Sequence, residues 1–309
     1  HGVDLMARIL LDPGDTAWVE EPGYRPVRAA FRAAGAELVR VPVDEEGLNV
    51  KEGERLAPHA RMAFVTPSYQ APLGVTLSLA RRLALLDWAV RANAWVLEDD
   101  YNGEYRYDTD PIPAVQALDH AGRVIYVGTF SKTLAPGLRI GYLIVPPVLI
   151  APVVRARLAS DLHTSVAEQA ALADFLTGGH FARHVRRTRE LYRRRQRVLV
   201  DLAPALTGGL LDVRSAPAGM QVLGLLPRGV DARAVARAAA ERGVQVTPLS
   251  RSAPTAMTDG RSGLLLGYAA FNLEATRSAL ATLGEVLAEV VARVPTAERL
   301  LGITKPRRK

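Results

Sequence analysis

Gly128–Tyr142 reads G-T-F-S-K-T-L-A-P-G-L-R-I-G-Y. Two predicted strands flank this segment, Arg123–Gly128 and Ile140–Val145, because both runs are rich in β-branched and aromatic residues and are bounded by Gly or Pro. The chain has 39 basic residues, but only four are lysines, and only Lys132 lies inside an apolar, strand-flanked segment. A lysine amine can lose its proton and attack a carbonyl group near neutral pH, whereas a guanidinium cannot. Lys132 is therefore a candidate nucleophile.

A lysine in a loop between two strands is more often a solvated side chain, so the reactive interpretation of Lys132 needs support from its neighbours. Thr129 and Ser131 supply hydroxyl groups and Arg139 supplies a guanidinium, a set suited to holding a phosphate dianion. The Pro-Gly pair that precedes Arg139 favours a turn, which would bring Arg139 back towards Lys132.

Three carboxylates and a phenol follow the short apolar run Ala94–Leu97, which predicts a buried strand. They are Glu98, Asp99, Asp100 and Tyr101. Ligands of open α/β sheets collect at the carboxyl ends of the strands. A solvated turn and a metal cluster are the alternatives, but no His lies nearby in sequence and the spacing matches no ligand motif, so we expect no metal.

A carboxylate, a phenol, a lysine and a phosphate cradle are together what pyridoxal phosphate chemistry requires. The carboxylate keeps the pyridine nitrogen protonated so that the ring acts as an electron sink. The phenol hydrogen-bonds to the ring oxygen, and the lysine attaches the cofactor covalently.

The chain resembles fold-type-I pyridoxal-phosphate enzymes of the aminotransferase class I/II group. Within that group it is most similar to the aminotransferase-like domain of MocR/GabR-type regulators of the GntR family. The resemblance covers the chain from its first residue to about Val294. It rests on four segments: Asp12–Tyr24, Glu98–Tyr107, Val127–Tyr142 and Gly263–Ala269.

The resemblance implies a site and a set of partners. It assigns catalytic roles to Lys132, Asp99 and Tyr101, with Lys132 as the point of covalent attachment, Asp99 at the pyridine nitrogen and Tyr101 at the ring oxygen. The remaining cofactor contacts that it implies are ring stacking by Tyr24 and phosphate binding by Thr129, Ser131 and Arg139. It also implies pyridoxal 5'-phosphate as the cofactor, a small amino acid or amine as the ligand, and a homodimer.

Two segments depart from the family pattern. Ser68–Gly74 reads S-Y-Q-A-P-L-G and includes Ala71, which has no polar group to offer to the ring oxygen. This favours a weakened or repurposed site over an efficient transaminase. In Pro248–Pro254 the family usually has aromatic residues, and here Arg251 is the candidate clamp for a substrate carboxylate, because guanidinium binds carboxylate bidentately. A surface loop arginine is the alternative for Arg251.

Strands such as Thr16–Val19 alternate with helices such as Ser78–Ala92, which Ser78 is predicted to cap. This alternation in the first half of the chain predicts an α/β fold with a doubly wound, mostly parallel sheet. The second half predicts a smaller α+β C-terminal domain, in which Val244–Thr247 is one of the predicted strands. We expect a cofactor-binding large domain over residues 1–178, a small domain over 179–294 and a basic tail over 295–309. The first residues already predict a helix, with no N-cap before it, so we expect a chain truncated at its N-terminus.

Composition narrows the classes of protein. There is no cysteine, which excludes disulfides and thiolate metal sites. Prolines interrupt the longest apolar region and no signal peptide is visible, so we expect a cytoplasmic protein with no membrane segment. The predicted helix His180–Leu202 carries eight arginines. Nucleic-acid binding is one interpretation of that helix, but Glu190 and Asp201 interleave with the arginines, which favours a solvated interdomain helix.

Three functions remain open. The first is an effector-sensing domain of a MocR-type transcriptional regulator, with DNA bound only through an upstream domain that this chain lacks. The second is an active aminotransferase that acts on an amino acid and a 2-oxo acid. The third is a nucleic-acid-binding module, which ranks last because a net charge of +7 over 309 residues is modest.

Overall fold

The structure is a computed structural model that describes residues 1–107, 112–251 and 261–293. Its chain divides into two compact units. The first consists of His1–Arg193 and Ala216–Met220, and the second of Arg194–Ser215 and the residues from Gln221 onward. The division falls within one long helix, whereas the sequence analysis drew its domain boundary after residue 178; that boundary stays a prediction.

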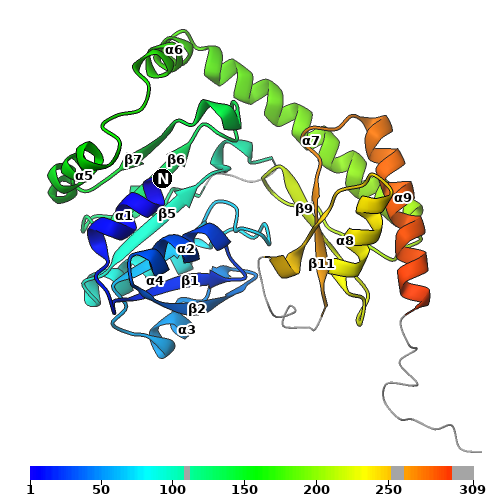
Figure 1. The fold of residues 1–309 in the computed structure, drawn as a ribbon, viewed down its shortest axis with the longest axis horizontal. Coiled ribbons are helices and arrows are strands. Elements are labelled where there is room, and N and C mark those ends of the chain that lie inside the picture. Colours follow the sequence, from blue (N-terminus) through cyan, green and yellow to red (C-terminus); the bar gives the residue numbers. More distant parts are fainter. Residues whose placement is uncertain (108–111, 252–260, 294–309) are drawn as a thin grey trace, which may run out of the picture. The chain divides into compact units, whose positions relative to one another are not determined.

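The first unit is built on a seven-stranded sheet in the order β3-β2-β1-β4-β5-β6-β7 (Figure 1). Its strands are β1 (Thr16–Glu21), β2 (Glu37–Asp44), β3 (Gly47–Leu48), β4 (Met62–Val65), β5 (Trp95–Asp100), β6 (Val124–Thr129) and β7 (Gly141–Ile144). The run from β2 to β6 is parallel, and only the edge strands β3 and β7 pair antiparallel with their neighbours. The predicted α/β, mostly parallel fold is confirmed. The carboxyl ends of β1, β4, β5 and β6 consequently share one edge.

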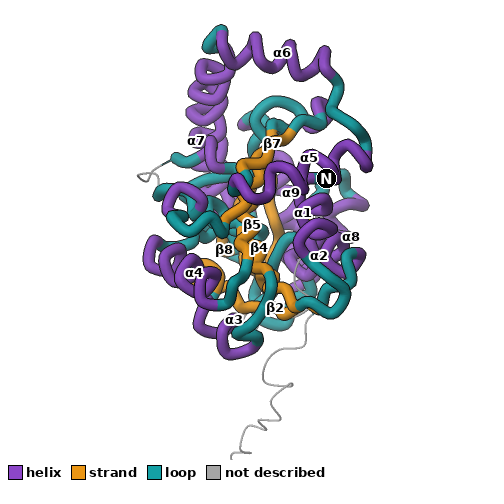
Figure 2. The backbone as a smooth tube through the Cα atoms, turned by 90° about the vertical axis from the view of Figure 1, so that its left-hand side faces the viewer, coloured by secondary structure: helices purple, strands orange, loops and turns teal. Residues whose placement is uncertain are grey.

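Helices cover both faces of this sheet (Figures 1 and 2). The α-helices of the first unit are α1 (Gly2–Leu10), α2 (Arg25–Ala33), α3 (Val50–Leu56), α4 (Leu79–Arg91), α5 (Pro147–Ser160), α6 (Val166–Thr177) and the first half of α7 (His180–Leu206). Successive strand residues point to opposite faces, so β1 contributes to two cores. Trp18 stacks on Trp88 of α4 with ring centroids 3.8 Å apart, whereas Val19 lies in the other core with Phe31 of α2.

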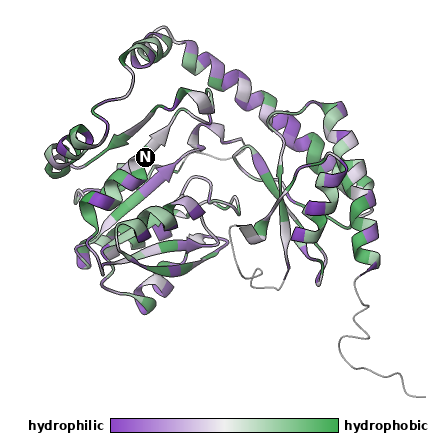
Figure 3. Cartoon of the chain, in the orientation of Figure 1, coloured by the Kyte–Doolittle hydropathy of each residue, from purple (hydrophilic) through white to green (hydrophobic). Residues whose placement is uncertain are grey.

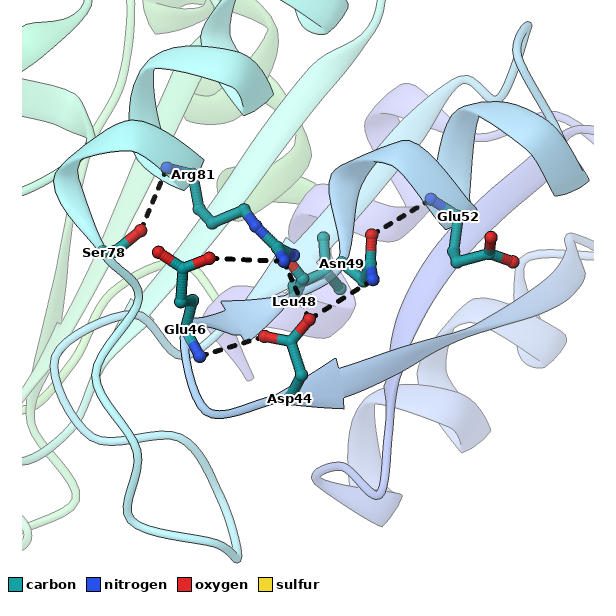
Figure 4. Close-up of polar contacts among 7 residues, drawn as sticks. All are labelled: Asp44, Glu46, Leu48, Asn49, Glu52, Ser78 and Arg81. Atoms are coloured by element: carbon teal, nitrogen blue, oxygen red, sulfur yellow. Dashed lines mark hydrogen bonds and ion pairs between the residues drawn. The ribbon is translucent and has the colours of Figure 1, made fainter. Parts of the chain in front are cut away.

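The polar segment after β2 folds into β3 and α3, two elements that the sequence pattern did not predict. Side-chain contacts shape it (Figure 4). Asn49 caps α3 by accepting a hydrogen bond from the Glu52 amide at 3.2 Å, and Arg81 of α4 pairs with Asp44 at 2.8 Å. The predicted Ser78 cap of α4 is confirmed, since its hydroxyl accepts from the Arg81 amide at 3.2 Å. Tertiary partners of this kind leave no periodic signal in the sequence.

Helix α5 was not predicted, because its prolines appeared only as interruptions of an apolar run. Pro147 lies at the first helical position, where its missing N–H removes no hydrogen bond. Pro152 lies inside the helix. Among the described residues, no helix combines the length and the apolar character needed to cross a membrane.

The second unit is built on a four-stranded antiparallel sheet in the order β10-β11-β9-β8. Its strands are β8 (Asp212–Val213), β9 (Gln221–Leu225), β10 (Thr247–Pro248) and β11 (Gly263–Gly267), and its helices are the second half of α7, α8 (Ala232–Glu241) and α9 (Leu273–Ala292). The α+β character is as predicted. The strand predicted over Val244–Thr247 is wrong in extent, because only Thr247 of that run pairs, opposite Leu265.

Candidate active site

The predicted acidic segment and the predicted phosphate cradle end two neighbouring strands. Asp99 lies opposite Val127 and Asp100 opposite Gly128 in the parallel β5–β6 register, so Thr129 follows at the same edge. Parallel pairing therefore brings together two segments that the sequence separates by about thirty residues. The carboxyl end of the sheet is where an α/β fold binds its ligands.

Asp99 is a carboxyl group in a poorly solvated place. Burial above all, together with the neighbouring carboxyls of Asp100 and Glu20, raises its pKa to about 7. Burial and like charges both disfavour the ionised form. A cation placed beside Asp99 would offset that penalty and hold the carboxylate ionised. A protonated pyridine nitrogen is such a cation.

Tyr101 carries a buried hydroxyl that makes no hydrogen bond of acceptable geometry among the described residues. Burial raises the pKa of this phenol well above its usual value, so the hydroxyl is protonated and able to donate; Asn102 acts weakly in the opposite direction. The ring packs edge-on against Tyr69, with centroids 6.4 Å apart. A buried donor without an acceptor is unfavourable, and a ligand oxygen at this point would relieve it.

Tyr24 lies immediately before α2 and is 43% exposed. Burial is the main reason for its raised pKa, while the negative charge of Asp99 adds to the shift and the positive charge of Arg139 opposes it. These three side chains therefore lie in one electrostatic neighbourhood. Arg139 itself follows the short 3-10 helix η3 (Pro136–Leu138) in a left-handed conformation, with φ of 51°.

The segment that carries Lys132 is a compact turn. The Ser131 amide donates to the Thr129 hydroxyl oxygen at 3.1 Å, and the Leu134 amide donates to the Phe130 carbonyl at 2.9 Å. The Lys132 side chain is exposed and makes no hydrogen bond or ion pair within the described part of the chain. Its amine is therefore available, while its approach to Arg139 stays a prediction.

Arg251 is the last residue of the 3-10 helix η4 (Leu249–Arg251) in the second unit. Its side chain lies outside the described residues, as do residues 252–260 that follow it. The predicted carboxylate clamp therefore stays a prediction. No group of three or more His, Asp or Glu side chains arranged to hold a metal occurs in residues 1–107, 112–251 and 261–293.

A buried carboxyl network at the end of β1 escaped the sequence analysis. Glu20 accepts hydrogen bonds from the Thr66 amide at 3.1 Å, the Thr66 hydroxyl at 2.7 Å and the Gln70 amide nitrogen at 3.0 Å. Burial raises the pKa of Glu20 to about 7 despite these donors. An acidic residue at the end of a predicted strand was the available signal, and it was the same signal that singled out Asp99.

The loop around Ala71, singled out as a departure from the family pattern, is held by Gln70. The Gln70 side chain donates to the carbonyls of Pro22 and Ala71 at 2.8 and 2.9 Å, and it accepts from the Leu73 amide at 3.0 Å. The loop thus keeps its shape through its own polar contacts. The Ala71 methyl group does not fill the role of a polar ring-oxygen contact.

The arginines of α7 differ in their contacts, although the helix is strongly hydrophilic as a whole (Figure 3). Arg189 donates to the Glu104 carbonyl at 2.8 Å, and Arg193 pairs with Glu190 at 2.8 Å. Arg195 donates to the Ala269 carbonyl. Some of the α7 arginines that suggested nucleic-acid binding thus bind carbonyl and carboxylate groups of the protein itself.

Comparison with known proteins identifies the family of this chain. The family model of aminotransferase class I and II matches residues 1–264. The chain belongs to the class I and II aminotransferase family. This family member is 42% identical over 281 residues to the probable rhizopine catabolism regulatory protein MocR of Rhizobium meliloti, covering 91% of this chain and 56% of that protein. It is 32% identical over 297 residues to aromatic-amino-acid aminotransferase 1 of Thermococcus litoralis, and the match covers 94% of this chain and 70% of that protein.

Solved structures give the same answer for the fold. The α-aminoadipate aminotransferase of Thermus thermophilus, complexed with N-(5'-phosphopyridoxyl)-L-leucine, has a TM-score of 0.86 at 28% identity and covers 95% of this chain and 76% of its own. The kynurenine aminotransferase of Pyrococcus horikoshii has a TM-score of 0.84 at 30% identity, and the match covers 93% of this chain and 72% of the aminotransferase chain. Family membership and these complexes indicate pyridoxal phosphate as the cofactor. The chain spans between half and three fifths of the length of the regulators it resembles.

Proposed function

We propose that this aminotransferase-like domain binds pyridoxal phosphate and senses an amino acid or amine for a MocR-type transcriptional regulator. The observation that carries the proposal is the pair of groups at the end of β5. Tyr101 has a buried hydroxyl in need of an acceptor, and Asp99 has a carboxyl in need of a cation. The cofactor ring offers both an oxygen and a protonated nitrogen, so the residues present fit the group.

Each site residue has a role in this proposal. Asp99 binds the pyridine nitrogen, Tyr101 donates to the ring oxygen, and Lys132 attaches the cofactor through its amine. The remaining contacts are the ring face, covered by Tyr24, and the phosphate, held by Thr129, Ser131 and Arg139. When bound, the cofactor supplies an electron sink for chemistry at the carbon next to an amino group.

Lys132 is the group in the site that can move a proton. If a ligand amine took its place on the cofactor, the Nζ atom of this exposed side chain would be released, and it would be the atom that holds or moves a proton. A sensor requires only this exchange of amines, because the exchange changes the contacts around Lys132 and thereby shifts a conformational equilibrium. Arg251 is proposed to bind the ligand carboxylate.

The same domain is proposed to act as a homodimer. Helices α5 and α6 and the connection between them expose large apolar side chains that a monomer would leave in water, among them Val148 at 72%, Leu162 at 62% and Val166 at 65%. Large apolar side chains exposed on neighbouring elements support an interface with a second copy of the chain. Light scattering coupled to size exclusion measures the mass; a strict monomer at micromolar concentration would contradict the dimer.

Catalytic transamination is the second candidate function. It is favoured by the presence of the whole residue set and by the similarity to aminotransferases, including 30% identity to the 2-aminoadipate transaminase of Thermus thermophilus. Ala71 argues against an efficient enzyme. Turnover of an amino acid with a 2-oxo acid separates the two functions, because a sensor exchanges amines without releasing a keto acid at a useful rate.

The cofactor assignment is tested by visible spectroscopy. Pyridoxal phosphate is added to the purified chain, the absorption band is recorded, and borohydride reduction is followed by peptide mass mapping. We expect a reduced adduct on Lys132 and none on the other lysines. Lys132→Ala should lose the band, and Lys51→Ala, at an exposed site of α3, should keep it. A folded protein without a band or adduct would contradict the proposal.

A further inference from the structure

One face of α7 contacts both segments that carry the proposed cofactor ligands. Thr133 follows Lys132 directly, and Tyr105 lies four residues after Tyr101. The α7 residues that meet them are His184, Thr188 and Tyr192, which recur every four positions and therefore share one side of the helix. The function described above assigns no role to this face.

His184 makes the central contact. Its Nε2 atom lies 2.8 Å from the carbonyl oxygen of Thr133. A carbonyl oxygen only accepts, so Nε2 carries the hydrogen in this contact. Thr133 is 1% exposed, so water does not compete for its main-chain oxygen. The hydrogen bond is part-buried and lies one residue from the proposed attachment lysine.

Tyr105 reaches the same carbonyl from the other side of the turn. Its hydroxyl lies 3.4 Å from the Thr133 carbonyl oxygen and 3.3 Å from the hydroxyl of Thr188 on α7. The ring is fully buried and packs edge-on against Tyr192 with centroids 5.0 Å apart. Arg189 of α7 fixes the preceding residue by donating to the Glu104 carbonyl. Helix, tyrosine and lysine turn thus form one connected group of contacts.

We propose that His184 and Tyr105 are positioning residues for Lys132, and that their hydrogen bonds to the Thr133 carbonyl hold the turn from which the lysine amine projects. The inference rests on the proposed role of Lys132 in cofactor attachment. It also gives α7 a part in the site, and α7 is the helix whose residues from Arg194 onward belong to the second unit.

Hydrogen exchange of the cofactor-free chain tests the contact without any activity. In His184→Ala, we expect the amides of residues 130–134 to exchange about 2- to 12-fold faster, the effect of losing one typical hydrogen bond. His184→Gln places an amide nitrogen at a similar reach and should restore wild-type exchange. His180→Ala is the matched control, because His180 lies one turn earlier on α7 and stacks on Phe175 instead. Amides of β4 and β5 report that each variant is folded.

Cofactor attachment provides the second measurement. Formation of the borohydride-reducible Lys132 adduct should slow in His184→Ala, recover in His184→Gln and stay unchanged in His180→Ala. Tyr105→Phe should give a smaller effect in the same direction, and it replaces His184→Ala if that variant does not fold. Wild-type exchange and wild-type attachment in a folded His184→Ala would overturn the inference. An absent adduct in the wild-type chain would refute the cofactor proposal. The hydrogen-exchange rates alone would then show whether His184 holds the turn that carries Lys132.

Discussion

Removing the Tyr101 hydroxyl should have opposite effects on stability and on cofactor binding. In the cofactor-free chain this hydroxyl is buried without a well-formed hydrogen bond. An unsatisfied buried polar group destabilises the folded state by about 1–3 kcal/mol. Tyr101→Phe should therefore raise the free energy of unfolding by about 1 kcal/mol or more. For a unit of this size, 1 kcal/mol corresponds to a rise in Tm of roughly 2–4 °C.

The same substitution should weaken binding of pyridoxal phosphate. A hydrogen bond to a charged oxygen contributes about 1.5–3 kcal/mol, so we expect the Kd to rise roughly 10- to 150-fold. Urea unfolding of the cofactor-free chain measures the first effect, and titration of the visible band measures the second. Both measurements use one protein preparation, so a general loss of folding cannot imitate the result.

Tyr126→Phe is the matched control for stability. Its hydroxyl is engaged, donating to the Asp100 carboxylate at 3.0 Å. Deleting it should destabilise the chain by about 1.5–3 kcal/mol, because it removes a hydrogen bond to a carboxyl group. If Tyr101→Phe destabilised the cofactor-free chain as much as Tyr126→Phe, the Tyr101 hydroxyl would have a partner and the reasoning would be refuted. An unchanged Kd would refute its contact with the ring oxygen.

Two further predictions concern buried charge. Glu20, Glu98 and Asp99 each have a pKa raised to about 7 by burial. These carboxyl groups bind protons more tightly in the folded than in the unfolded chain. Their contribution to the free energy of unfolding is therefore fully present below pH 4 and is lost as the pH rises through 7. Urea unfolding should show a stability at pH 5 that exceeds that at pH 8 by a few kcal/mol, on the order of 1.4 kcal/mol per pKa unit; a flat profile would contradict the burial argument. Arg82 is fully buried and donates to three carbonyls, at 2.9, 3.0 and 3.0 Å, so Arg82→Leu should cost about 3 kcal/mol or more in urea. Arg91→Leu, at an exposed ion pair of the same helix, should cost at most about 1 kcal/mol, and equal losses would disprove the structural role of Arg82.

Much of the fold follows from patterns that are local in the sequence. Alternating apolar strands and amphipathic helices predicted a parallel α/β sheet, and Ser78 predicted where α4 begins. The elements that escaped prediction have non-local causes. The α3 segment depends on Asp44, Asn49 and Arg81, which meet only after β2 and α4 are in place. The α5 helix carries prolines whose effect depends on where the helix begins.

The candidate site divides in the same way. Lys132, Asp99 and Tyr101 could be selected from the sequence, because each lies directly after a strand-like run and has a chemistry that its neighbours support. Glu20 carried the same strand-end signal as Asp99, but neither its buried network nor the contact of His184 could be predicted. Their partners, Gln70 and Thr133, lie 50 and 51 residues away along the chain.

By itself, the sequence determined the fold class, the segments that reach the carboxyl edge of the sheet, and the residue types available for chemistry there. Residue type and strand periodicity are local properties, and they were sufficient for that. Only the tertiary structure decided which carboxyls are buried, which hydroxyl lacks a partner and which helix holds the lysine turn. The physical reason is that a pKa near 7 for Asp99, and the burial of the Tyr101 hydroxyl, come from solvent exclusion by distant segments.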